Sequence, residues 1–210
     1  MMCKTLLLAA IVVVAVTAKP SLVKYSDEPA FCKTLDCPTF NKTGEGKGYE
    51  IRAYSPAKWV STTILNLNYD EAVEQGFEYL FKYISGDNVP GIKVDMTAPV
   101  TTRVIPAPGP ACENNFTVSF FVPFIHQDNP PQPSNPEVSI TSLPAFEAYV
   151  RVFPGRAKQD DWIKNAELLK ESLQNTTAEY DKTFYYTAGY DSPFTIFERH
   201  NEIWFFKSSS

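Results

Sequence analysis

Strict alternation of hydrophobic and polar residues is clearest at 92–97, which reads Ile-Lys-Val-Asp-Met-Thr. A period of two predicts an extended segment with one buried face. Pro99 follows and lacks a backbone N–H, so the segment fits a sheet edge or a bend better than a central strand.

Similar patterns divide the chain into two halves with the same order of elements. In each half, two extended segments, a helix and two further extended segments are predicted: 49–54, 58–67, 70–84, 92–105 and 116–123, then 137–141, 146–153, 159–173, 183–190 and 202–206. We infer the repeat from this order and not from matching residues. It predicts one α+β domain with pseudo-twofold symmetry.

The first helix carries its hydrophobic residues at helical spacing: Val73, Phe77, Leu80, Phe81 and Ile84. Asn68 or Asp70 can cap its start, and Gly86 suits its end. The second helix has the same kind of face, with Trp162, Ala166, Leu169 and Leu173. Core packing explains such faces.

Three further motifs accompany the segment 92–100: Tyr-Glu-Ile-Arg-Ala-Tyr-Ser-Pro-Ala-Lys-Trp-Val at 49–60, Gly-Tyr-Asp-Ser-Pro at 189–193 and Asn-Glu-Ile-Trp at 201–204. With these motifs in this order, the chain resembles the SOUL/heme-binding-protein family from about residue 49 to 206. The resemblance implies a distorted antiparallel β-barrel flanked by two long helices, and haem or a related porphyrin as ligand.

The first eighteen residues are typical of a signal peptide. Lys4 is followed by an apolar run over 6–16 and by the small-residue site Val-Thr-Ala at 16–18. The run is about half of the roughly 20 residues that a membrane anchor needs. We therefore expect a secreted or lumenal protein, with an irregular N-terminal arm over 19–48 and a single SOUL domain over 49–207.

Cys32, Cys37 and Cys112 remain after removal of the signal peptide. In an oxidising compartment a disulfide is expected, and the odd count leaves one thiol. Both Cys32–Cys37 and Cys37–Cys112 fit the sequence. No grouping of cysteine and histidine has zinc-ligand spacing.

Three Asn-x-Thr triplets are candidate glycosylation sites, at Asn41, Asn115 and Asn175. The net charge of −5 and the scattered basic residues argue against a nucleic-acid partner.

The sequence contains no Gly-x-Ser-x-Gly, His-Glu-x-x-His, phosphate-binding or dinucleotide-binding motif, so we expect a protein that is not an enzyme. His126 and His200 are possible iron ligands, although a loop position explains each of them. Met96 is a possible thioether ligand, with a buried strand position as the alternative.

For haem, the resemblance implies an apolar groove along the first helix. Its candidate residues are Val73, Phe77, Leu80, Phe81, Lys82 and Met96. Lys82 matches a basic position of the family, whereas Glu74 and Thr195 replace two others. Some members carry histidine at the position of Ala53, and the alanine methyl group cannot bind iron.

Three functions follow, in order of preference. The first is a secreted carrier or scavenger of haem or porphyrin that binds without catalysis. The second is a secreted interaction protein that keeps the fold without haem. The third is a tetrapyrrole-modifying enzyme or hydrolase, for which the sequence shows no nucleophile–base pair.

Overall fold

The computed structural model describes residues 29–208 apart from 110–111, 193 and 197. The expected signal peptide and the start of the arm lie outside the described residues. The strands are β1 (Phe40–Gly46), β2 (Tyr49–Tyr54), β3 (Ala57–Asn66), β4 (Val100–Ile105), β5 (Asn114–Phe121), β6 (Val138–Leu143), β7 (Phe146–Phe153), β8 (Tyr185–Gly189) and β9 (Asn201–Phe206). The helices are α1 (Tyr69–Ile84) and α2 (Gln159–Leu173), with the short 3-10 helices η1 (Ala30–Cys32) and η2 (Phe124–His126).

All nine strands form one antiparallel sheet in the order β1-β2-β7-β9-β8-β4-β5-β3-β6. The order is symmetric about the central β8–β4 pair: counting outwards, β9 and β5 take equivalent positions, as do β7 and β3, and β2 and β6. The α+β class is confirmed. The predicted barrel is not closed, because the edge strands β1 and β6 do not pair with each other within the described residues. The pseudo-twofold relation of the halves stays a prediction.

Two predicted segments differ from the structure. Residues 40–46, expected to be irregular, form β1, which pairs with β2 through a register shift between Lys42 and Gly44. Residues 92–99, expected to be extended, pair with no strand among the described residues. Their hydrogen bonds go elsewhere: Val94 N donates to Ile84 O at 2.8 Å, and Ala98 N donates to Asp36 O at 3.1 Å.

Helix α1 packs tightly onto β3 and β5. Asn68 is its N-cap, and the Asn68 side chain accepts a hydrogen bond from Glu71 N at 3.2 Å. A Cβ atom on Gly76 would lie 2.6 Å from Val118 Cγ2, so only glycine permits this close approach.

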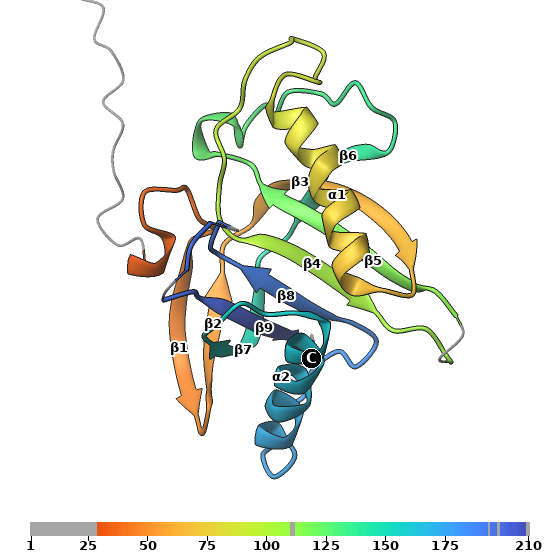
Figure 1. Cartoon of the computed structure of the whole chain (residues 1–210). Helices are drawn as coiled ribbons and strands as arrows, with labels where there is room; N and C mark the ends of the chain where they lie inside the picture. The colour runs from red at the N-terminus through yellow and green to blue at the C-terminus, as the bar shows by residue number, and fades with distance from the viewer. Residues whose placement is uncertain (1–28, 110–111, 193, 197, 209–210) are drawn as a thin grey trace, which may run out of the picture.

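Helix α2 lies on the same face of the sheet as α1, with β4 and β8 between them (Figure 1). The two helices meet near their first residues. Tyr69 N donates to Gln159 Oε1 at 2.6 Å, and the rings of Tyr69 and Trp162 are 6.0 Å apart. Tyr69 and Trp162 therefore join the two halves in one hydrophobic core.

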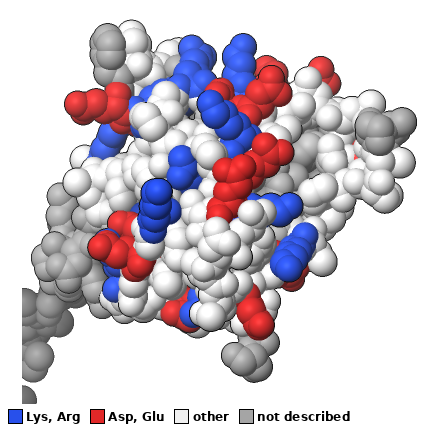
Figure 2. All heavy atoms as spheres, turned by 90° about the horizontal axis from the view of Figure 1, so that it is seen from below, with Lys and Arg blue, Asp and Glu red and all other residues white. Residues whose placement is uncertain are grey.

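Acidic and basic side chains are mixed over the lower face of the molecule, where no broad basic area appears (Figure 2). None of the helices in the described part of the chain is long and apolar enough to cross a membrane.

Candidate functional site

The outer side of α1 presents an aromatic pair to solvent. The Phe77 ring packs against Phe120, with centroids 5.2 Å apart, and stacks on Phe81 at 5.8 Å. Phe77 is half-buried, whereas Phe81 is 51% exposed. Phe77 thus anchors the pair to the sheet, and Phe81 offers an uncovered ring.

The other predicted wall residues support this pair to different degrees. Val73 and Met96 are half-buried against the core beneath α1. Leu80 is fully buried, so it is a core residue that can only support a ligand surface from below. Lys82 is exposed at the end of the helix, and no ion pair involving it is found among the described residues.

The loop between β8 and β9 begins close to the aromatic pair. Phe120 pairs with Val100, and Val100 pairs with Gly189, the last residue of β8. Neighbouring strands are ~4.8 Å apart, so Gly189 lies about 10 Å from Phe120 on the same face of the sheet. The loop carries Phe194, which is 91% exposed.

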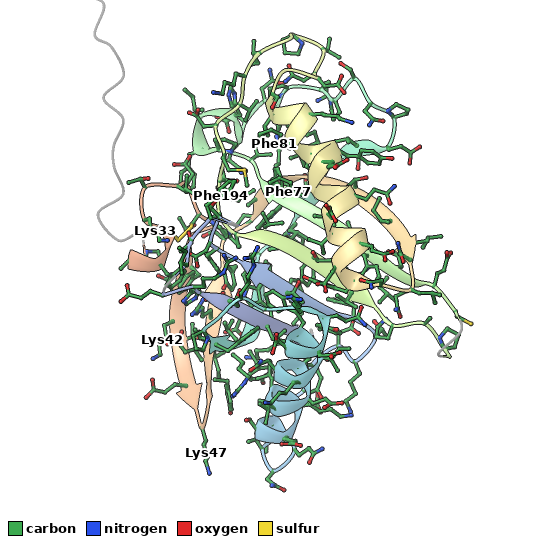
Figure 3. All side chains as sticks on the ribbon, viewed as in Figure 1. Lys33, Lys42, Lys47, Phe77, Phe81 and Phe194 are labelled. Atoms are coloured by element: carbon green, nitrogen blue, oxygen red, sulfur yellow. A yellow bond between two sulfur atoms is a disulfide. The ribbon has the colours of Figure 1, made fainter. Side chains whose placement is uncertain are left out.

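We call Phe77, Phe81, Met96 and Phe194 the α1 surface; Figure 3 labels its three phenylalanines. Sequence reasoning did not single out Phe194 or its neighbour Ile196, which is 80% exposed. The signal for both was present. They are large apolar residues directly after the 189–193 motif, outside any predicted strand.

A network of hydrogen bonds around Glu202 lies buried in the sheet, apart from the α1 surface. The Glu202 carboxylate is fully buried and accepts four hydrogen bonds. The donors are Arg52 Nη1 at 2.8 Å, His200 Nε2 at 2.6 Å, Trp204 Nε1 at 2.7 Å and the Tyr190 hydroxyl at 2.9 Å. Burial alone would raise the pKa of Glu202, but the hydrogen bond from His200 and the charge of Arg52 outweigh it and lower that pKa.

This network, which we call the Glu202 network, determines the role of His200. Its Nε2 is bonded to Glu202, and its ring stacks on Phe31 with centroids 4.0 Å apart. His200 is therefore held as a structural residue. His126 lies half-buried on η2. No group of three or more His, Cys, Asp or Glu side chains that could hold a metal is found in the described part of the chain.

Ala53 lies on β2, which is five strands from β5 in the sheet. Its neighbour Tyr54 packs in one buried cluster with Ala98, close in the chain to Met96. The methyl group of Ala53 itself cannot bind iron.

The disulfide joins Cys32 and Cys37, which decides between the two pairings that the sequence left open. Cys112 is exposed and free. Of the three candidate glycosylation sites, Asn41 and Asn175 are exposed, whereas Asn115 is half-buried within β5. Glycosylation itself stays a prediction.

Two pockets lie along α2, with volumes of about 530 Å³ and 420 Å³. None of the six predicted groove residues lines either of them. Trp162, Ala166 and Leu173 of the predicted α2 face line them, but that face was predicted to pack in the core and not to border a pocket.

Comparison with known proteins places the chain in a family. A family model described as SOUL heme-binding protein matches residues 35–206. Heme-binding protein 2 of Homo sapiens is 39% identical over 74% of this chain and 76% of its own length, and that of Mus musculus is 42% identical with the same coverage. Heme-binding protein 1 of Mus musculus is 32% identical over 78% of this chain and 86% of its own length.

Among solved structures, the EcmrR C-terminal domain has a similar fold, with a TM-score of 0.59 and 10% identity over 77% of this chain and 99% of that chain. The family match covers the described sheet and both helices. The chain belongs to the SOUL heme-binding protein family.

Proposed function

We propose that this protein is a secreted carrier or scavenger that binds haem or a related porphyrin on the α1 surface, without catalysis. The observation that carries the proposal is the stacked Phe77–Phe81 pair with its exposed Phe81 ring, in a chain whose relatives are named Heme-binding protein 1 and 2. The expected signal peptide supports secretion. The names of the relatives support haem binding and not catalysis as the function.

The residues of the α1 surface fit a flat macrocycle with acidic side groups. A porphyrin face can lie against Phe81 and Phe194, which water otherwise covers. Lys82, in the last turn of α1, would pair with a propionate. Iron in the bound haem would supply redox and ligand-binding chemistry, and the half-buried Met96 is the residue of this surface whose thioether is a known type of haem ligand.

The contribution of Phe81 can be estimated from its exposure. A phenylalanine buries roughly 200 Å², so covering the 51% of Phe81 that is exposed removes about 100 Å² from water. At ~25 cal/mol per Å² this is worth about 2.5 kcal/mol. Removing the ring should therefore weaken binding by ~50-fold.

The test is a haem titration, followed by the Soret band, of protein purified from a secretory host. Wild type should give a saturable shift at micromolar haem. Phe81→Asp should weaken binding ~50-fold or more, and Lys82→Glu should weaken it about threefold to tenfold. Leu67→Asp and Lys47→Glu are matched controls, because both residues are exposed and lie off the α1 surface. Equal losses in controls and test variants would contradict the proposed site.

The alternative is an interaction protein that keeps the fold without haem. Glu74 favours it, because this carboxylate is exposed on α1 where the resemblance implies a basic residue. The same titration separates the two functions. No saturable Soret shift would favour the interaction protein.

A further inference from the structure

The two pockets beside α2 form one elongated cleft. They share Pro106, Lys170, Tyr185 and Phe205, so they meet end to end. Their α2 residues run from Gln159 to Leu173, which is about 21 Å along the helix axis. We call this the α2 cleft.

The cleft exists because α2 cannot approach the sheet as α1 does. Counted from the first residue of each helix, Ala72 and Gly76 of α1 correspond to Trp162 and Ala166 of α2. Gly76 allows α1 to lie against Val118, whereas Trp162 and Ala166 are bulkier than their counterparts, and α2 makes fewer close backbone contacts with the sheet than α1 does. The space left on the side of β4 and β8 is the cleft.

The two ends of the cleft differ in chemistry. The smaller pocket, of about 420 Å³, is lined mainly by apolar and aromatic side chains, among them Val104, Phe116, Trp162 and Ile163, and Glu167 is the one carboxylate among its described lining residues. Its volume lies within the ~300–1,000 Å³ that is usual for small-molecule sites. This end suits the apolar body of a ligand.

The larger pocket adds positive charge. Lys170 lines both pockets, and Lys182 lines the larger one. Neither lysine forms an ion pair with another residue of the described ranges. The carboxylate of Asp181 also lines this pocket, but it already accepts hydrogen bonds from Thr183 N at 2.8 Å and Thr183 Oγ1 at 2.6 Å. The two lysines are therefore available to a ligand anion.

We propose that the α2 cleft binds a long-chain monocarboxylate of the fatty-acid type. Its chain would lie in the smaller pocket, and its carboxylate would lie between Lys170 and Lys182. The elongated shape favours a chain over a disc. An acyl chain spans about half of the ~30 Å hydrocarbon core of a bilayer, or ~15 Å, which fits within the cleft.

The test uses calorimetry with laurate and, as a charge-reversed control, dodecylammonium, both below their micelle concentrations. Laurate should bind at one saturable site, and dodecylammonium should bind at least about tenfold more weakly. Replacing both Lys170 and Lys182 by glutamine should weaken laurate about tenfold. Ile163→Glu should weaken it further, because Ile163 lines the apolar pocket and is 43% exposed, so the fold tolerates the change. Lys164→Gln, on the exposed side of α2, is the matched control.

The inference is overturned if laurate shows no saturable binding, if dodecylammonium binds equally well, or if the double lysine variant and Lys164→Gln behave alike. The same variants in the haem titration keep this result separate from the proposed function. We expect haem binding to be unchanged by the α2 variants, and laurate binding to be unchanged by Lys82→Glu. Loss of haem binding in the α2 variants, with no effect of Lys82→Glu on haem, would overturn the α1 surface as the haem site, whereas the laurate assignment is judged by the laurate titrations alone.

Discussion

Replacing Glu202 with glutamine is expected to destabilise the fold by about 3 kcal/mol. The buried carboxylate accepts four hydrogen bonds, two of them from Arg52 and His200. A glutamine side chain has one acceptor oxygen, and its NH₂ group would face donors. The change also leaves Arg52, which is 2% exposed, with less negative charge around it.

The size of this loss in unfolding free energy depends on the contacts that Arg52 keeps in the variant. Removing one partner of a buried ion pair costs roughly 3–5 kcal/mol. Glu50 still contacts Arg52, with its Oε2 2.8 Å from Nη2, so the low end of that range applies. For a chain of this size the loss corresponds to a fall of about 6–12 °C in Tm.

Urea unfolding at pH 7, followed by tryptophan fluorescence, measures this change. Glu147→Gln is the matched control, because its ion pair with Lys207 lies at the surface and should contribute less than about 1 kcal/mol. A loss below about 1 kcal/mol for Glu202→Gln, or equal losses for both variants, would refute the reasoning.

The stability difference between wild type and Glu202→Gln should depend on pH in a definite direction. The pKa of Glu202 is lower in the folded protein than its ordinary value of 4.5. Its stabilising contribution is therefore present above about pH 4.5 and is lost as the pH falls through the lowered, folded-state pKa. The difference in unfolding free energy between wild type and Glu202→Gln should shrink below about pH 4.5. A constant difference down to pH 2 would contradict the assigned pKa direction.

Three further substitutions test the architecture by the same unfolding measurement. Gly76→Leu should cost about 2–4 kcal/mol, since its side chain would collide with Val118, and a neutral result would show that α1 can move away from the sheet. Asn68→Ala should cost about 1 kcal/mol through loss of the helix cap, with no cost if another group takes its place. Removing the disulfide by changing Cys32 and Cys37 to serine should cost about 2 kcal/mol, because the closed loop is short, whereas Cys112→Ser should change nothing.

Elements defined by local patterns were predictable from the sequence. Helix α2 occupies the predicted residues 159–173, and Asn68 caps α1 as one of the two expected candidates. Periodicity and caps act within a few residues, so a single sequence records them. The same holds for β2 and β7, whose ends match the predicted bounds.

Elements defined by distant partners were not predictable. Strand β1 has the polar, glycine-containing sequence Phe-Asn-Lys-Thr-Gly-Glu-Gly and forms because β2 lies beside it. Residues 92–99 alternate as a strand would, yet the arm and the end of α1 take their hydrogen bonds. Tertiary context overrides local preference in both cases.

The candidate site also combines features that local patterns predict with features that depend on distant residues. The helical face with Phe77 and Phe81 could be predicted from the spacing of its residues. Which of those residues lie in the core could not, and Leu80 proved to be fully buried. Arg52 and Glu202 meet across 150 positions of sequence. The α2 cleft depends on how closely a helix approaches a sheet, which no spacing of residues records.

The most direct test of the central claim is to locate haem on the protein by NMR. In ¹⁵N-labelled protein, titration with paramagnetic haem should broaden the backbone signals of 77–82 and of the described loop residues 194–196, while those of α2 remain. Broadening confined to residues that line the α2 cleft, or none at saturating haem, would contradict the proposal that haem binds on the α1 surface.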